Sequence, residues 1–259
     1  MILVIDVGNT NTVMALMREH EVVWSWRIST IVRTTDEFGL TVLELLRHRD
    51  VPPEDVEGVV ISCVVPSTLY AMEKAFRRYL EIDPLIVGRG LRTGMRVHTD
   101  NPREVGSDRV VNAVAAVERF TPPLVVVDFG TATTFDCVDH QGDYVGGAIA
   151  PGLRISAEAL FKRTSKLPRV DIRMPKKAIG TNTVASMQSG LFFGYVGLVD
   201  NLALHCKAEL ARTAQGAEVT CIATGGLSNL IGRACKQVDH VDPQLTVRGL
   251  SLLFARNRN

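Results

Sequence analysis

The chain opens with an apolar run that ends in an acid, a glycine and small polar side chains. Residues 1–13 read MILVIDVGNTNTV, and residues 124–135 repeat this arrangement as LVVVDFGTATTF. An apolar run followed by Asp-x-Gly predicts a buried strand, a tight turn and a second strand. The small polar side chains after each glycine can donate hydrogen bonds to anionic oxygens. Two such loops predict two related half-domains that hold one phosphate-bearing ligand.

Around the two loops, the pattern predicts strands first and then alternating helices and strands. In the first half, strands are expected at 13–16, 22–28, 56–64 and 85–87, and helices at 36–49, 68–79 and 102–120. In the second half, strands are expected at 133–139, 144–149, 219–224 and 238–241, and helices at 151–161, 183–212, from 228 onward and at 245–255. The Pro122-Pro123 pair marks a boundary, which predicts domains at 1–120 and 121–259.

Composition excludes several classes of function. The 29 basic and 28 acidic side chains leave a net charge of +1, which gives no electrostatic case for a nucleic acid or an anionic membrane as partner. The five cysteines are scattered without a C-x-x-C pair, as is typical of reduced thiols. The first residues lack a basic segment, and Asp6 interrupts the apolar run too early for a signal peptide. These features predict a cytoplasmic protein.

A second polar motif, Gly106-Ser107-Asp108-Arg109, falls within the helix expected at 102–120 or at a break in it. An adjacent acid and arginine can be a solvated surface pair. However, the apolar stretch VVNAVAAV follows directly, which favours a position near a cavity. There a carboxylate can take a proton from a hydroxyl, and a guanidinium can hold a carboxylate or a phosphoryl group. Two glycine motifs, at 146–152 and 225–226, fit ligand binding or ordinary turns.

The motifs, in their order along the chain, resemble those of type III pantothenate kinases, within the acetate kinase, sugar kinase, Hsp70 and actin superfamily. They are Asp6-x-Gly8-Asn9-Thr10, Gly106-x-Asp108-Arg109, Asp128-Phe-Gly130-Thr131-Ala-Thr133, Gly147-x-Ile149-x-Pro151-Gly152 and Gly225-Gly226. The Asp-x-Gly loops are shared across the superfamily, whereas Gly106-x-Asp108-Arg109 and the preceding residues 101–105 narrow the resemblance to this family. It covers essentially the whole chain and implies an α/β fold of two duplicated ribonuclease H-like domains, each with a mixed five-stranded sheet flanked by helices.

The resemblance further implies ATP-dependent phosphorylation of the terminal hydroxyl of pantothenate, the first step of coenzyme A biosynthesis. It implies Mg²⁺ with the nucleotide, a monovalent cation (K⁺ or NH₄⁺) and a homodimer. Asp108 would be the catalytic general base, and Gly106, Ser107, Asp108, Arg109 and Thr183 would bind substrate. Asp128 would hold the cation. ATP would be bound by Asp6, Val7, Gly8, Asn9, Thr10, Asn11, Thr12, Val13, Gly130, Thr131, Thr133, Gly225 and Gly226.

One position departs from the family pattern, because Thr99 stands where many members carry an aromatic residue. The residues also leave other functions open: a kinase for a sugar, acetate or another small hydroxyl substrate, a phosphatase, a structural role, or a transcription-activating accessory factor of the same family. Gly106-x-Asp108-Arg109 argues against a sugar or acetate kinase. The near-neutral charge argues against the accessory factor. Glycines at 190, 194 and 197 predict close helix packing, within the chain or across a dimer.

Overall fold

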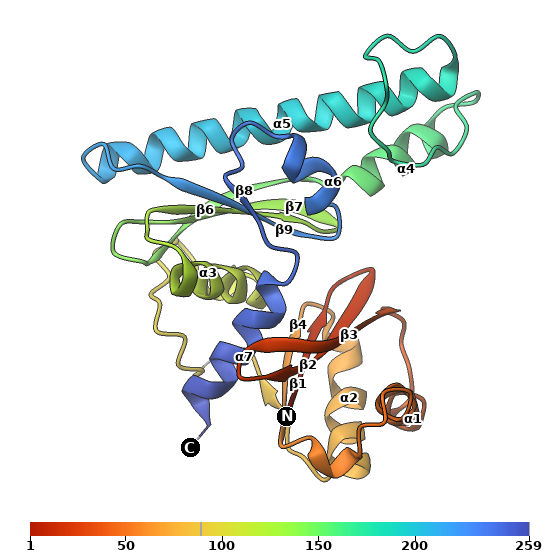
Figure 1. Cartoon of the computed structure of the whole chain (residues 1–259), viewed down its shortest axis with the longest axis vertical. Helices are drawn as coiled ribbons and strands as arrows, with labels where there is room; N and C mark the ends of the chain where they lie inside the picture. Colours follow the sequence, from red (N-terminus) through yellow and green to blue (C-terminus); the bar gives the residue numbers. More distant parts are fainter. Residues whose placement is uncertain (89, 259) are drawn as a thin grey trace. The chain divides into compact units, whose positions relative to one another are not determined.

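The computed structural model describes residues 1–88 and 90–258; Arg89 and Asn259 lie outside the described residues. The chain divides into two compact units (Figure 1). Unit 1 comprises Met1–Gly94, Arg103–Ala115 and Gln244–Asn259, and unit 2 comprises Met95–Pro102 and Ala116–Pro243. The single boundary expected at 120/121 stays a prediction; by packing, both units are discontinuous in sequence, and the last helix belongs with unit 1.

Unit 1 is built on a mixed sheet of five strands. The strands are β1 (Ile2–Val7), β2 (Asn11–Arg18), β3 (Glu21–Ser29), β4 (Gly58–Cys63) and β5 (Leu85–Ile86). The helices are α1 (Thr35–Arg47), α2 (Pro66–Tyr79) and α7 (Leu245–Asn257), and unit 1 also holds most of α3 (Ser107–Arg119). Strand β1 is buried on both faces, because α1 and α2 cover the face of Leu3 and Ile5 and α7 packs on the face of Val4, so its apolar run needs no alternation.

Unit 2 repeats the same sheet. Its strands are β6 (Leu124–Phe129), β7 (Ala132–Val138), β8 (Tyr144–Pro151), β9 (Thr220–Gly225) and β10 (His240–Val241). Its helices are α4 (Leu153–Arg163), α5 (Thr183–Thr213) and α6 (Ser228–Ile231). The strand orders are β3-β2-β1-β4-β5 and β8-β7-β6-β9-β10, with the same parallel and antiparallel pairs in both. The duplicated fold expected from the sequence is therefore confirmed.

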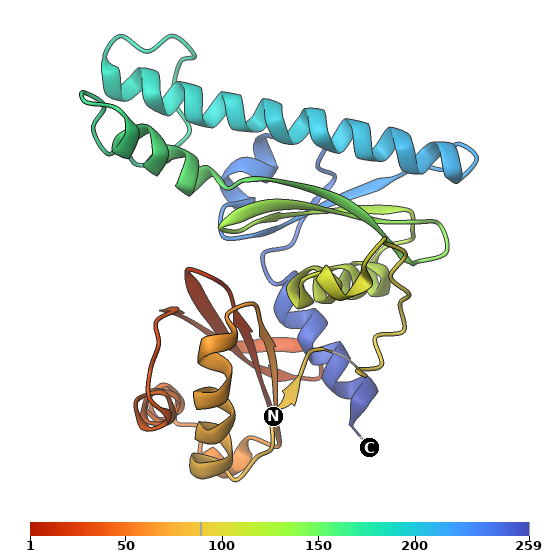
Figure 2. The same ribbon diagram turned by 180° about the vertical axis from the view of Figure 1, so that it is seen from behind.

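Each unit has its own hydrophobic core on one face of its sheet. In unit 1, α1 and α2 lie side by side against the face that carries Leu3, Ile5 and Val7, as both views show (Figures 1 and 2). In unit 2, the long helix α5 covers the face that carries Val125 and Val127. Because side chains alternate along a strand, the opposite face of each central strand carries the acid of the Asp-x-Gly loop. No helix among the described residues is long and apolar enough to cross a membrane.

The expected helix at 102–120 is wrong in its first turn. A 3₁₀ turn occupies Pro102–Glu104, and α3 begins only at Ser107. Pro102 suits the first position of a turn, and Gly106 then separates the turn from the helix. The shift matters because it places Asp108 in the first helical turn, where backbone N–H groups have no helical partner.

Candidate active site

The first Asp-x-Gly loop is a tight turn between β1 and β2. The Gly8 N–H donates to the Asn11 carbonyl at 3.1 Å, and a Cβ added to Gly8 would lie 3.1 Å from the same oxygen. The Thr12 hydroxyl is fully buried and pairs with the Thr30 hydroxyl at 2.9 Å. Asn9, Thr10 and Asn11 are exposed. The turn therefore presents its amide and hydroxyl groups at residues 9–11, whereas the Thr12 side chain is held inside unit 1.

The Gly106–Arg109 motif lies beside this loop, because a residue of β4 connects the two. Asp6 on β1 is the register partner of Ser62 on β4, so both side chains share one face of the sheet. The buried Ser62 hydroxyl contacts the Ser107 hydroxyl at 3.0 Å. Unit 1 thus brings together the first loop and the predicted substrate motif, which lie about a hundred residues apart in the sequence.

The Asp108 carboxylate folds back over the start of α3. Its Oδ1 accepts a hydrogen bond from the Arg109 N–H at 2.9 Å, and a Cβ on Gly106 would lie 2.5 Å from that oxygen. Glycine is needed at position 106 because a side chain there would displace the carboxylate. Burial raises the pKa of Asp108, while the Arg109 N–H and the Arg109 charge partly oppose the rise. A raised pKa makes this carboxylate a better proton acceptor than a solvated aspartate.

In unit 2, Asp128 is packed against the Gly225 backbone. Gly225 has φ of +88°, and an added Cβ would lie 2.7 Å from the Phe129 nitrogen and closer still to Asp128 Oδ1. The Gly226 N–H donates to the Phe129 carbonyl at 3.2 Å. Glycine is thus required at position 225 by the backbone conformation and by the carboxylate beside it. The structure brings together Asp128 and the two glycines predicted for adenosine.

The second loop is in backbone contact with the residue that precedes α4. The Gly152 N–H donates to the Thr131 carbonyl at 3.1 Å, and a Cβ on Gly152 would lie 2.7 Å from the Gly130 carbonyl and nearer still to that of Thr131. Gly152 is also the N-cap of α4. The glycine motif at 146–152 therefore supports the Gly130–Thr131 turn by direct backbone contact.

The Thr133 hydroxyl points away from Asp128, into the core under α5. It contacts the Tyr195 hydroxyl at 2.5 Å, and the Tyr195 hydroxyl donates to the Pro151 carbonyl at 2.9 Å. Since tyrosine has one hydroxyl proton, Thr133 must donate its own proton to Tyr195. The Thr133 side chain is 1% exposed and its proton is engaged, so only its main chain can serve the predicted phosphate contact.

Polar side chains line the face of the unit 2 sheet that carries Asp128. Thr134 and Thr224 are the register partners of Asp128 on the neighbouring strands β7 and β9. The Thr134 hydroxyl donates to buried Asp136 at 3.1 Å. The Thr224 hydroxyl is fully buried, and its oxygen has no hydrogen-bond partner among the residues that the structure describes. An orphaned hydroxyl next to a carboxylate has the chemistry of a ligand for a hard cation.

Thr183 is the first residue of α5 and is exposed. It lies about 18 Å along α5 from Tyr195, the residue that contacts the second loop, given 1.5 Å per helical residue. Unit 2 by itself therefore does not bring Thr183 to the Asp128 group. Thr99, the position that departs from the family pattern, has a buried hydroxyl oxygen without a hydrogen-bond partner in residues 1–88 and 90–258.

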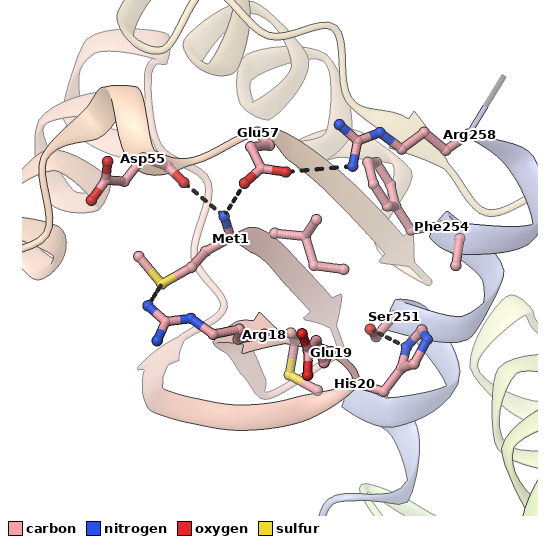
Figure 3. Close-up of a pocket in the computed structure, with 12 residues that line it drawn as sticks. Met1, Arg18, Glu19, His20, Asp55, Glu57, Ser251, Phe254 and Arg258 are labelled. Atoms are coloured by element: carbon pink, nitrogen blue, oxygen red, sulfur yellow. Dashed lines mark hydrogen bonds and ion pairs between the residues drawn. The ribbon is translucent and has the colours of Figure 1, made fainter.

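A pocket of about 710 Å³ lies elsewhere in unit 1 and contains none of the predicted site residues (Figure 3). Its walls come from the start of β1, the β2–β3 turn and α7, so it sits at the opposite end of β1 from the first loop. Its polar groups largely bond one another: His20 Nδ1 lies 2.8 Å from the Ser251 hydroxyl, and Glu57 pairs with the Met1 amine at 2.8 Å. The motifs, and not this pocket, mark the candidate active site.

Sequence reasoning missed three residues that the structure adds to the site: Ser62, Thr224 and Tyr195. Thr224 and Ser62 are hydroxyl residues near the ends of apolar strands, at equivalent places in the two sheets. No shared spacing marks them in the sequence, because Ser62 follows Asp6 by 56 residues and Thr224 follows Asp128 by 96. Tyr195 carried no local signal, because only the packing of α5 on β7 brings it to Thr133.

Comparison with known proteins decides the family. The family model described as type III pantothenate kinase matches residues 2–205. The chain belongs to this family. It is 47% identical over 258 residues to a type III pantothenate kinase of Halalkalibacterium halodurans, covering 99% of this chain and all of the relative. Relatives of the same description from Exiguobacterium (48%) and Listeria monocytogenes (49%) match all 259 residues, covering 100% and 98% of their own lengths. This kinase family phosphorylates pantothenate in coenzyme A biosynthesis.

Solved structures agree on the fold of the kinase. A Campylobacter jejuni structure named for the Baf family of transcriptional activators has a TM-score of 0.59 at 16% identity, covering 99% of this chain and 98% of that one. An inorganic polyphosphate/ATP-glucomannokinase from Arthrobacter has a TM-score of 0.51 at 12% identity, covering 98% of each chain. At such identities these likenesses carry the fold alone, in line with the actin and sugar kinase architecture expected from the sequence.

Proposed function

We propose that Asp108 is the general base that takes the proton from the terminal hydroxyl of pantothenate as the γ-phosphoryl group of ATP is transferred. The observation that carries this proposal is the Ser62–Ser107 contact, which sets the start of α3 beside the first loop within unit 1. The raised pKa of Asp108 supports it, because proton affinity is what a base requires. The proton moves late, as the oxygen attacks, since phosphoryl transfer has little covalent chemistry for the protein to do.

Substrate binding falls to the other residues of the motif. The Arg109 guanidinium suits the carboxylate of pantothenate or the transferred phosphoryl group, because its planar donors match both. Ser107 supplies a hydroxyl on the same helical turn. Gly106 leaves the space in which the Asp108 carboxylate sits. Thr183 completes the proposed set from the exposed start of α5.

For the phosphates of ATP, the proposed donors of the first loop are the exposed side chains of Asn9, Thr10 and Asn11. In the second loop, they are the main chain around Gly130 and the Thr131 side chain. The buried hydroxyls of Thr12 and Thr133 bond other side chains, so their residues contribute backbone groups. Gly225 and Gly226 offer bare backbone to the adenosine.

Two kinds of cation fit this chemistry. Mg²⁺ accompanies ATP and offsets the charge of its phosphates. A monovalent cation, K⁺ or NH₄⁺, would be held by Asp128, and the buried, unpartnered hydroxyl of Thr224 on the neighbouring strand fits the same ion. Carboxylate and hydroxyl oxygens are hard ligands of the kind that such ions take.

A homodimer through α5 completes the proposal. A Cβ added to Gly190, Gly194 or Gly197 would meet no atom within 4 Å, so one stripe of the helix is open to another surface. Phe193 and Leu204 are exposed on the same helix. We therefore expect a dimeric mass by light scattering at micromolar concentration. The reduced cysteines of the sequence favour the cytoplasm as the location.

A substrate panel tests the function. ADP release is measured with pantothenate, acetate, glucose or no acceptor, each in potassium and in sodium buffer. The proposal expects release only with pantothenate, and faster in potassium. ADP release without an acceptor would indicate a phosphatase. Equal rates of pantothenate-dependent release in both salts would contradict the proposed cation site at Asp128 but not the assignment as a kinase.

A further inference from the structure

Four of the five cysteines gather in the core of unit 2. Cys137 on β7, Cys221 on β9 and Cys235 after α6 are buried in that core, and Cys206 on α5 packs against it while remaining partly exposed. All five are free thiols. None of these four belongs to the residues proposed for ATP, pantothenate or cation. Their gathering on facing elements is therefore a feature that the kinase reaction does not explain.

Helix α5 runs along β7, so residues of the two elements face each other at two places. At one end, Thr133 on β7 bonds Tyr195 on α5 at 2.5 Å. Cys137 lies four residues further along β7, about 13 Å, on the same face of the strand. Cys206 lies eleven residues further along α5, about 16 Å, in the stripe of Val199 and Ala203 that faces the sheet. These matched distances place the two thiols opposite each other, and Cys206 packs against the buried cluster that holds Cys137.

We propose that Cys137 and Cys206 are a redox pair that a hydroperoxide converts into an intramolecular disulfide between β7 and α5. The Cys206 thiolate attacks the peroxide, its sulfur becomes a sulfenic acid, and the O–O bond breaks to release water or an alcohol. The Cys137 thiol then attacks the Cys206 sulfur and expels the sulfenic oxygen as water. The two thiols together lose two protons and two electrons, and the peroxide takes them up to give water and an alcohol, or two waters when the oxidant is hydrogen peroxide.

The two thiols differ in the way that these roles require. Cys206 is the more exposed and can meet the oxidant, whereas Cys137 is 8% exposed and can be reached only from inside. Their mutual hydrogen bond lowers the pKa of Cys206 and raises that of Cys137, with burial opposing the first shift and adding to the second. A partly exposed thiol of lowered pKa next to a buried thiol is the arrangement of an attacking and a resolving cysteine.

The disulfide would fasten the long helix to the strand that leaves the second phosphate loop. It closes a loop of about 70 residues, and cross-links over loops of this length stabilise a fold mainly by restricting the unfolded chain. We expect the oxidised protein to melt about 5 °C or more above the reduced protein, in the range that such a restriction gives. The inference does not depend on which substrate the kinase phosphorylates.

The test treats the full-length, reduced protein with stoichiometric hydrogen peroxide. The expected result is a chain that is two hydrogens lighter by denaturing mass spectrometry and not cross-linked to another chain, with a peptide map that links Cys137 to Cys206, a raised melting temperature, and full reversal by dithiothreitol. Cys206→Ser should lose the mass change and the thermal shift. In Cys137→Ser, dimedone should trap a sulfenic acid at Cys206. The matched control is Cys63→Ser in unit 1, which should behave as the wild type does.

Three outcomes would overturn the proposal. One is a wild-type chain that keeps a free Cys206 thiol while methionines are oxidised. Another is a cross-link that joins Cys206 to Cys221 or to a second chain. The third is an unchanged mass loss in Cys206→Ser, a partly exposed position at which serine should fold normally. Cys221→Ser separates the second case, because the proposed bridge should form without Cys221.

Discussion

Replacing Gly225 by alanine tests the packing on which the second half of the site depends. Gly225 ends β9 at φ of +88°, and its Cα lies against the Asp128 carboxylate and the Phe129 backbone. Two costs follow for Gly225→Ala. The left-handed backbone costs alanine about 1–2 kcal/mol. The methyl group adds about 1–3 kcal/mol of overpacking, because its nearest neighbours include the backbone of the central strand, which cannot move aside cheaply.

Gly142→Ala is the matched control for the first of these costs. Gly142 lies in unit 2 with φ of +84°, and a Cβ there would meet only the Val117 side chain at 3.6 Å and the Pro122 ring at 3.9 Å. Both variants carry the conformational cost, and only Gly225→Ala carries the steric one. We therefore expect Gly225→Ala to be less stable than Gly142→Ala by about 1–3 kcal/mol, a melting temperature lower by roughly 2–12 °C for a chain of this size.

Thermal melts of the two variants, with potassium activation of ADP release, provide the assay. Because the group that the methyl displaces is Asp128, Gly225→Ala should need far more potassium for half-maximal activity, whereas Gly142→Ala should keep the wild-type requirement. Equal melting temperatures in the two variants, together with a wild-type potassium requirement in Gly225→Ala, would refute the reasoning.

Further predictions concern single side chains of the site. Thr224→Val removes a buried hydroxyl that has no partner in the described part of the chain, so it should raise the stability of the protein by about 1–3 kcal/mol and weaken potassium activation about tenfold. A less stable Thr224→Val protein would contradict the reasoning that this hydroxyl is buried without a partner. Tyr195→Phe leaves the Thr133 hydroxyl without its acceptor, so the stability of the protein should fall by about 1–3 kcal/mol. The KM for ATP should rise while the KM for pantothenate stays unchanged. A change in the KM for pantothenate alone would argue against a role of Tyr195 in supporting the second loop. Burial raises the pKa of Asp108 in the folded state, so the ionised carboxylate lowers stability above that pKa and the loss disappears as the pH falls through it. Asp108→Asn should consequently be at least as stable as the wild type at pH 7. A markedly lower melting temperature in this variant would show that the ionised Asp108 carboxylate stabilises the fold, contrary to the prediction.

Much of the fold could be predicted from the sequence because its signals are local. The two apolar runs ending in Asp-x-Gly gave both central strands, and the repeated order of strands and helices indicated the duplication. The helix at 102–120 was placed too early, because the pattern does not distinguish a 3₁₀ turn followed by glycine from a continuous helix. The place of α7 in unit 1 could not be read from its position at the end of the chain.

The site residues also divide into those that local sequence marks and those that only packing brings together. Glycines and acids at strand ends are marked by their neighbours in sequence, so the loops at Asp6 and Asp128 were found. Thr133 was assigned to phosphate because it follows a loop, yet strand alternation turns its side chain to the other face, towards Tyr195. Contacts between elements distant in sequence, such as Ser62 with Ser107, depend on register and packing that no local pattern carries.

The most direct test of the central claim is the turnover of Asp108→Asn with saturating ATP and pantothenate in potassium buffer. Asparagine keeps an acceptor for the Arg109 N–H but cannot take a proton. We predict a folded protein whose kcat falls by about 10²- to 10⁴-fold, the usual contribution of a general base. A folded Asp108→Asn protein with nearly wild-type kcat would contradict the assignment of Asp108 as the base.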